Sequence, residues 1–412
     1  MFPKAEEAIN KALALNPDLA EAHAALGGLI RQMGGEMDKA MFHLERAVEL
    51  NPSYSPAYNW LGLAYNEMAQ FDKAIDVFSR GQQIDPLSAV LASNLAYAAG
   101  SVGDYDEMKR RLDRLAETHP ESPFAYTGQS YYELLVTGRL DEALRLMLRT
   151  VVADPNDTQP RAFVAFFLDS LGDRDAAENW LDSAFALQPN SSDAKAMRVL
   201  IDAQNGRLER AQAEAREFAA DYGRTALSFE WVAELLNSAD VDSGNAQAAI
   251  ARYRESFPQY WADNARPINI TVVDQGIEMV RLLRETGDAE RADVLLGEVI
   301  SVLEAAPIIG LGSGFRLPAA YALAGRTDDA MNALRTVVDA GYRYAWRNAF
   351  DHHWGFESLR DQPEFQSMRI ELDADMQKQL ENARRMQANG EMPTVPGMEL
   401  LSRPENSGAP PI

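Results

Sequence analysis

Residues 55–86 read SPAYNWLGLAYNEMAQFDKAIDVFSRGQQIDP, and this stretch decides the fold. Apolar residues recur in it three or four positions apart, first around Leu61 and Tyr65 and then around Ala74 and Phe78. Such spacings place apolar side chains on one face of a helix. The four residues AQFD between the two helical segments form a tight turn. The stretch therefore predicts two short antiparallel helices that pack against each other.

The same pattern returns along the chain with a fixed period. Each copy closes on a proline, and successive prolines are 34 or 35 residues apart: Pro17, Pro52, Pro86, Pro120, Pro155 and Pro189. Proline ends the second helix because it lacks a backbone N–H and clashes with the preceding turn. One helix pair cannot bury its apolar face alone, so this period predicts a stack of pairs.

Glycine marks the turn between the two helices in most copies. It can adopt the left-handed conformation that ends a helix without a steric penalty. The turn glycines are Gly103, Gly138, Gly172, Gly206, Gly287 and Gly325. Small residues inside the helices, Gly27 and Gly62 among them, predict that the two helices of a pair approach closely.

The recurring pattern resembles the tetratricopeptide-repeat family, clearly over residues 3–223 and more weakly to about residue 341. In the copy quoted above, the family's signature positions are held by Tyr58, Leu61, Gly62, Tyr65, Ala74, Phe78 and Pro86. Only Gly81 departs, where the family usually has alanine. The resemblance implies an all-α fold, a right-handed α-solenoid of about ten helix-turn-helix repeats with a C-terminal capping helix.

The pattern divides the chain into four regions. We expect a regular repeat array over 1–223, divergent helix pairs over 224–341, an aromatic-rich capping segment with a long helix over 342–388, and a disordered tail over 389–412, which is rich in Pro, Gly and Ser. A solenoid needs a cap because its last pair otherwise exposes an apolar face. The side chains expected to cover that face are Trp346, Phe350, Trp354, Phe356 and Phe365.

Charge and composition exclude several functional classes. The chain has 62 acidic and 39 basic residues, a net charge of −23, so its field repels phosphate and argues against direct nucleic-acid binding. It has no cysteine, hence no disulfide, thiolate nucleophile or cysteine-bound metal. No run of about eighteen apolar residues occurs, so we expect no membrane insertion. We expect a cytoplasmic location or, alternatively, a periplasmic one as the soluble arm of a membrane-tethered regulator.

The sequence offers no convincing catalytic or metal site. Adjacent His352 and His353 point in different directions on a helix and have no third ligand nearby. The glycine-rich run 310–314 follows a helix end rather than a strand and lacks a Lys-Ser/Thr pair, so a phosphate loop is disfavoured. We therefore predict a protein that is not an enzyme and that carries no cofactor and no metal.

The family resemblance implies a peptide groove. Positions 2, 5, 9 and 12 of each first helix line the concave face in this family. In the copies that begin at residues 55, 89, 123 and 158 these positions hold no Lys or Arg, so the family's Lys and Asn clamp for acidic C-termini is absent. An amide-and-aromatic groove for an extended peptide remains. The groove residues are Asn59, Leu63, Asn66, Ser93, Tyr97, Phe124, Thr127, Tyr131 and Phe166.

Two alternatives to the groove stay open. Its aromatic residues could merely pack between neighbouring first helices, or the acidic convex face could bind a basic protein instead. The leading function is a protein–protein interaction scaffold, or the sensory arm of a bacterial signalling assembly, with a protein or peptide partner.

A narrower resemblance concerns residues 315–385. They look like the repeat region of bacterial signalling proteins whose effector is an adenylate cyclase, a winged-helix regulator or a protein kinase. Counting back from Pro17 also places Ala5 at the start of a second helix, as if the chain began mid-repeat. The alternative function is thus a regulatory C-terminal fragment of such a multidomain protein, with a missing N-terminal effector domain.

Overall fold

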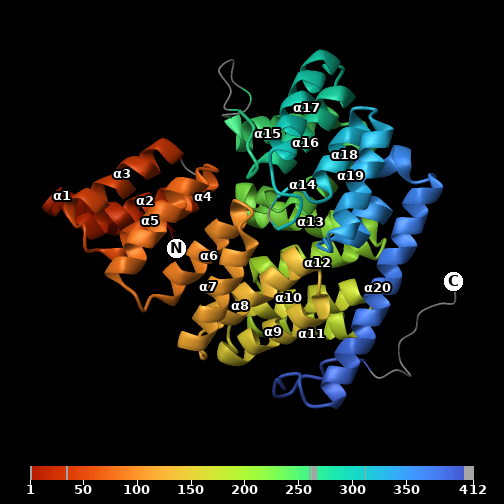
Figure 1. Ribbon diagram of the computed structural model, residues 1–412. Helices are drawn as coiled ribbons and strands as arrows, with labels where there is room; N and C mark the ends of the chain where they lie inside the picture. The colour runs from red at the N-terminus through yellow and green to blue at the C-terminus, as the bar shows by residue number, and fades with distance from the viewer. Residues whose placement is uncertain (1, 34–35, 259–260, 262–266, 311, 403–412) are drawn as a thin grey trace. The chain divides into compact units, whose positions relative to one another are not determined.

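A computed structural model describes residues 2–33, 36–258, 261, 267–310 and 312–402 of the 412-residue chain. In these residues every regular element is a helix and no β-strand occurs, which confirms the predicted all-α class (Figure 1). The chain forms two compact units, here called unit 1 (residues 1–128) and unit 2 (residues 129–412). No helix within the described ranges is long and apolar enough to cross a membrane.

Unit 1 is a stack of helix pairs. It consists of α1 (Phe2–Leu15), the pairs α2 (Ala20–Gln32) and α3 (Met37–Leu50), α4 (Ser55–Glu67) and α5 (Phe71–Ile84), α6 (Ala89–Ser101) and α7 (Tyr105–Thr118), and the start of α8 (Pro123–Tyr132). Each first helix packs on the second helix of its pair, and the first helices also contact one another, α2 with α4 and α4 with α6. The surface made by α2, α4 and α6 is called the first-helix face of unit 1.

Glycines inside the first helices set the spacing within a pair. A Cβ atom added to Gly62 of α4 would lie 2.4 Å from the ring of Phe78 on α5. One added to Gly27 of α2 would lie 2.6 Å from Leu44 on α3. Leu44 and Phe78 are both fully buried. The predicted close approach of paired helices is confirmed, because a larger residue at either glycine would push the pair apart.

The turns follow the glycine pattern. All six turn glycines named above have positive φ, between +68° and +99°. Residue 69, in the turn between α4 and α5, is alanine instead and still has φ of +54°. An L-residue in this conformation costs about 1–2 kcal/mol because its Cβ crowds the following carbonyl. Ala69 is therefore a point of backbone strain in unit 1.

We expect Ala69→Gly to stabilise the protein by about 1 kcal/mol, since glycine adopts a positive φ without that steric cost. A rise in the midpoint of urea unfolding at unchanged slope would show it. The control is Ala8→Gly at an exposed position inside α1, which should cost roughly 0.5–1 kcal/mol through lost helix propensity. A loss of stability at both positions would contradict the strain at Ala69.

Unit 2 continues the helix pairs. The rest of α8 runs into a π-helical turn η1 (Glu133–Thr137) and pairs with α9 (Leu140–Ala153). The later pairs are α10 (Thr158–Leu171) and α11 (Arg174–Leu187), α12 (Ser192–Gln204) and α13 (Leu208–Tyr222), α14 (Glu230–Asp242) and α15 (Ala246–Ser256), α16 (Val273–Glu285) and α17 (Ala289–Glu304), and α18 (Arg316–Leu323) and α19 (Thr327–Asp339). A 3₁₀ turn η2 (Gly223–Ser228) joins α13 to α14.

The end of the chain folds back over the earlier pairs of unit 2. It contains a π-helical turn η4 (Asn348–His352), a 3₁₀ turn η5 (Trp354–Leu359) and the long helix α20 (Pro363–Ala388). Helix α20 contacts α19, as a cap on the last pair would, and it also contacts α10 and α9 (Figure 1). The capping segment thus reaches well beyond the last pair.

The side chains predicted to form the cap lie mostly in the core of unit 2. Trp346, Phe350, Phe356 and Phe365 are at most 2% exposed, whereas Trp354 is half-buried. Of the region expected to be a disordered tail, the structure describes residues 389–402, and four of its apolar side chains are buried: Met392, Val395, Leu400 and Leu401. Residues 403–412 lie outside the described residues.

Candidate functional site

The predicted groove residues of α4 and α6 lie on the first-helix face of unit 1. Asn59 and Asn94 join the two helices, because Asn94 Nδ2 donates to Asn59 Oδ1 over 2.7 Å. Leu63 and Tyr97 are half-buried, and Ser93 is buried with 4% exposed. The helices thus bring amide, hydroxyl and apolar groups together on one surface.

One ion pair joins two charged groups of this face. Arg31 on α2 forms an ion pair with Glu67 at the end of α4. Burial raises the pKa of Glu67, and the opposing charge of Arg31 only partly offsets that effect. Close to Glu67, Asn66 presents a buried Oδ1 with no hydrogen-bond partner among the described residues. Because Arg31 is paired with Glu67, its guanidinium is not available to bind a ligand carboxylate.

Two further groove residues lie on the part of α8 that belongs to unit 1. Phe124 is 44% exposed and Thr127 is half-buried. A Cβ added to Gly128 would lie 3.7 Å from Tyr97 Oη, so α6 and α8 approach each other at this point. The groove residues of α4, α6 and early α8 therefore come from three consecutive first helices.

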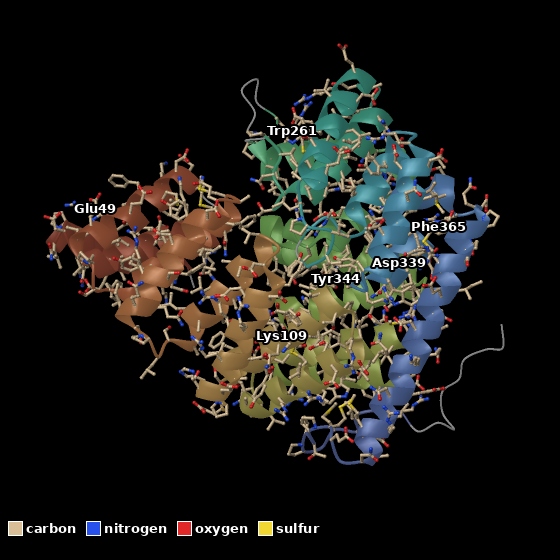
Figure 2. The ribbon with its side chains drawn as sticks, viewed as in Figure 1. Glu49, Lys109, Trp261, Asp339, Tyr344 and Phe365 are labelled. Atoms are coloured by element: carbon tan, nitrogen blue, oxygen red, sulfur yellow. The ribbon has the colours of Figure 1, made fainter. Side chains whose placement is uncertain are left out.

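The remaining two groove residues lie in unit 2, where both contact other aromatic rings. The ring of Tyr131 packs edge-on against Phe163 at 5.2 Å, and burial raises the pKa of its hydroxyl. Phe166 on α10 is fully buried, with its ring centroid 5.7 Å from that of Tyr344. Tyr344 lies among the helices of unit 2 (Figure 2). The structure does not bring Phe166 to an accessible surface, whereas Tyr131 is half-buried.

Later segments of the same chain contact the first helices of unit 2. The backbone N–H of Gly310 donates to the carbonyl of Leu135 over 2.8 Å. Arg347 Nη1 donates to the carbonyl of Asp169, at the end of α10, over 3.0 Å. The π-helical turn η4 contacts α12. Gly310, Arg347 and the turn η4 therefore occupy the first-helix side of unit 2.

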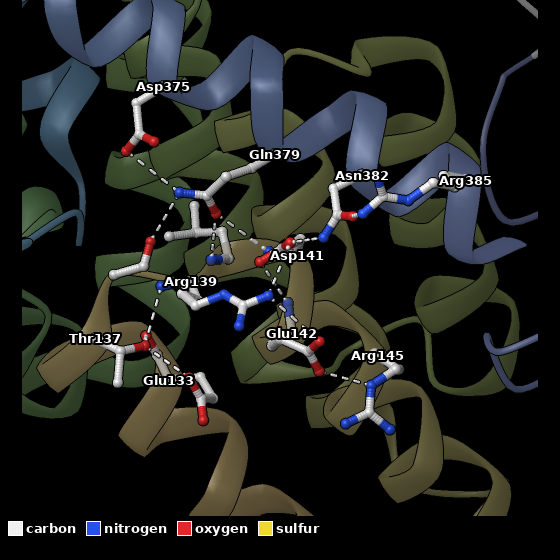
Figure 3. A network of polar contacts seen from close by, with 12 residues as sticks. Glu133, Thr137, Arg139, Asp141, Glu142, Arg145, Asp375, Gln379, Asn382 and Arg385 are labelled. Atoms are coloured by element: carbon white, nitrogen blue, oxygen red, sulfur yellow. Dashed lines mark hydrogen bonds and ion pairs between the residues drawn. The ribbon is translucent and has the colours of Figure 1, made fainter.

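Helix α20 makes a polar network with the start of α9 (Figure 3). Gln379 Oε1 accepts from the backbone N–H of Leu140 over 2.7 Å, and its Nε2 donates to the carbonyl of Gly138 over 3.0 Å. Asn382 hydrogen-bonds the carboxylate of Asp141. The first N–H groups of a helix have no partner within it, so Gln379 supplies one for α9 from far along the chain.

Unit 2 also holds a cavity that the sequence does not indicate. Its volume is about 80 Å³, and residues of α14, α15, α16 and the segment 342–356 line it. Burial raises the pKa of Glu234 and Glu278 in its wall and lowers that of His353 to about 4. His353 is half of the histidine pair noted above, and the structure places its partner His352 beside the carbonyl of Gln204 instead. One residue could have pointed to this cavity from the sequence. Glu278 is a carboxylate between apolar Ile277 and Met279, on a helix whose side chains are mostly buried.

Comparisons with known proteins agree with the helix-pair architecture. Residues 43–76 match the model of the tetratricopeptide repeat family. The chain is 27% identical over 120 residues to anaphase-promoting complex subunit 3 of Schizosaccharomyces pombe, covering 29% of this chain and 18% of that protein. It is 29% identical over 95 residues to small glutamine-rich tetratricopeptide repeat-containing protein 2 of Mycosarcoma maydis, covering 23% of this chain and 27% of that protein. The matches thus span less than a third of either relative.

The chain is also similar to parts of solved structures. YrrB, described as a tetratricopeptide-repeat protein with an unusual peptide-binding site, is 22% identical, with 45% of this chain and 95% of that chain covered and a TM-score of 0.30. PilF of Pseudomonas aeruginosa is 16% identical, with 47% of this chain and 87% of that chain covered and a TM-score of 0.36.

Proposed function

Because the chain is a tetratricopeptide-repeat protein, we propose that it is a non-enzymatic interaction scaffold that binds an extended segment of a partner protein on the first-helix face of unit 1. The contact residues in this proposal are Asn59, Leu63, Asn66, Ser93, Tyr97, Phe124 and Thr127. They are the predicted groove residues that lie in unit 1.

The observation that supports this proposal most is the way unit 2 uses the same positions. Phe166 stands at the ninth position of its first helix, as Tyr97 does, and it packs against Tyr344. Asp169 stands at the twelfth position, as Asn66 does, and its carbonyl accepts from Arg347. In unit 2 the ninth and twelfth positions thus contact another segment of the chain. In unit 1 the same two positions carry an aromatic ring and an amide.

The chemistry of the site favours an uncharged mode of binding. Asn and Ser side chains can bond the backbone of an extended peptide, and Tyr97, Leu63 and Phe124 can contact its apolar side chains. Arg31 is already paired with Glu67. Salt screens exposed charges but has little effect on apolar contacts, so the affinity should depend weakly on ionic strength.

A partner for the test is obtained by affinity capture from the source cell with the chain as bait. Replacing Asn59, Asn66 and Tyr97 together by Ala should then weaken capture more than tenfold, or about 1.4 kcal/mol. Helicity by circular dichroism should stay nearly unchanged, since all three side chains are only half-buried. The matched control replaces exposed Lys109 and Arg110 on α7 by Ala, which should leave capture intact (Figure 2).

One pattern of results would overturn the groove. If capture survives the triple replacement but is lost at high salt, the working surface is the acidic convex face and its partner is a basic protein. An equal loss of partner capture in the triple variant and in the Lys109 and Arg110 control would also contradict a specific role of the groove residues.

We further propose that the scaffold serves as the arm of a larger signalling assembly. The resemblance of residues 315–385 to the repeat regions of signalling proteins supports this role. Sequencing the coding region upstream of Met1 tests it, because an in-frame cyclase, kinase or winged-helix domain would be expected there.

A further inference from the structure

The cavity in unit 2 has the size and the lining of a binding site for a small molecule. One water molecule needs roughly 10–15 Å³ of such space, so about 80 Å³ holds several waters or one small organic molecule. Its wall combines three carboxylates with aromatic rings. The carboxylates are Glu234, Asp274 and Glu278, and the aromatic side chains are Tyr253, Phe315, Tyr342, Tyr344 and Phe356.

Two buried polar atoms in this wall lack partners. Tyr253 is fully buried and Gln275 is 9% exposed, and neither Tyr253 Oη nor Gln275 Oε1 has a hydrogen-bond partner among the described residues. Asn237, which lies beside the Tyr253 hydroxyl, already donates to Glu278 over 2.8 Å and accepts from Arg252 over 3.0 Å. Buried polar groups in folded proteins are almost always hydrogen-bonded. An amide oxygen can only accept, so the missing partner is a donor.

The charges of the wall leave a negative excess. Asp274 is balanced by Arg316, whose Nε lies 2.7 Å from Asp274 Oδ1. Glu278 accepts from two neutral donors, Asn237 and, over 2.7 Å, the indole of Trp354.

Arg281 is the guanidinium that faces both Glu278 and Glu234, and it also bonds Ser238. His353 adds no charge at neutral pH, because burial lowers its pKa to about 4. Buried Glu278 and half-buried Glu234 thus share the guanidinium of Arg281, and a ligand with one positive charge would balance the second carboxylate.

We propose that this cavity binds a small primary ammonium compound. Its N–H groups would donate to Gln275 Oε1, Tyr253 Oη and the carboxylate of Glu278, while its alkyl part packs on the aromatic rings. Aromatic faces attract cations as well as alkyl groups, so the same wall serves both ends of such a molecule.

The test is isothermal titration of the full chain with propylammonium chloride at constant ionic strength. We expect saturable binding of one molecule per chain. Two probes separate the contributions of charge and of hydrogen bonding: 1-propanol, which has the same size but no charge, and tetramethylammonium, which has the charge but no N–H. Each should bind at least tenfold more weakly than propylammonium.

Variants of the full chain then place the site. Tyr253→Phe removes a hydroxyl that has no partner in the described residues, so folding should be retained while propylammonium affinity falls at least threefold. Glu278→Gln should lower the affinity at least tenfold. The control is Glu298→Gln on the exposed surface of α17, which should leave the affinity unchanged. Absence of saturable binding, equal binding of 1-propanol, or an equal effect of Glu298→Gln would overturn the proposal, the last by indicating non-specific attraction to an acidic surface.

Discussion

Removal of residues 342–412 is expected to unfold unit 2 and leave an aggregating chain. Trp346, Phe350, Phe356 and Phe365 all lie in the core of this unit and are at most 2% exposed. Truncating one such side chain to Ala typically costs about 3–5 kcal/mol. The loss of all four together approaches or exceeds the net stability of a typical domain, about 5–15 kcal/mol. Circular dichroism, size-exclusion chromatography and dye binding to exposed apolar surface measure the effect.

A shorter truncation provides the comparison. Removal of residues 390–412 takes away Met392, Val395, Leu400 and Leu401, which are 4–8% exposed, but leaves α20 and the four core aromatics in place. We expect a folded chain with a lower melting temperature. A chain that lacks 342–412 and still melts like the full protein would show that the C-terminal segment is dispensable for the core of unit 2.

The second large effect is expected for Gly138→Ala in the turn between η1 and α9. Gly138 has φ of +68°, and an added Cβ would lie 1.9 Å from the backbone oxygen of Gly341. The positive φ alone costs an L-residue about 1–2 kcal/mol. Because the obstacle is backbone, the clash can be relieved only by moving the link between α19 and α20, and we expect a total loss above about 3 kcal/mol.

Gly206→Ala is the matched control for this prediction. Gly206 occupies the equivalent turn between α12 and α13, with φ of +72° and nothing within 4 Å of an added Cβ. Only the conformational cost should remain, so the loss should be about 1–2 kcal/mol. Urea unfolding of the two variants measures both numbers. Equal losses would mean that the contact between residues 138 and 341 contributes nothing to stability.

The features that the sequence predicts well are local ones. A turn glycine, a closing proline and an apolar residue three or four positions from the next each act within one repeat. The helix pairs of unit 1 and the left-handed glycines of both units are therefore visible in the sequence. Even the strained turn at Ala69 can be located, because the period requires a turn where glycine is missing.

The contacts that organise unit 2 could not be predicted from the repeat pattern. They join residues far apart in the sequence and do not recur with the repeat period. Phe166 and Tyr344 meet across 178 positions, as do Asp169 and Arg347. Gln379 lies 239 positions from Leu140. The repeat pattern places Phe166 and Asp169 on a first-helix face but is silent about what covers that face. The division into units near residue 128 has the same origin, since the periodic region itself continues to about residue 223.

The end of the chain shows a different limit. Residues 389–402 are rich in Gly, Pro and polar residues, which is typical of disorder. Their few apolar side chains have no regular spacing, yet Met392, Val395 and Leu400 each find a place in the core of unit 2. Ser402 also donates its backbone N–H to Asp173 over 3.0 Å. Such individually anchored residues give no pattern from which to infer order.

The link between α20 and the start of α9 has a consequence for how the protein folds during synthesis. In an open repeat array each pair contacts only its neighbours, so folding can begin anywhere and spread. Unit 2 instead joins Asp141 to Asn382, 241 residues later. Ribosomes add about 5–20 residues per second, so roughly 10–50 s pass before α9 can meet its partner helix. Until residues 346 and 350 have been made, the apolar side chains of unit 2 that pack on Trp346 and Phe350 lack these neighbours. We therefore expect nascent unit 2 to depend on chaperones more than unit 1, whose compact unit is complete after 128 residues.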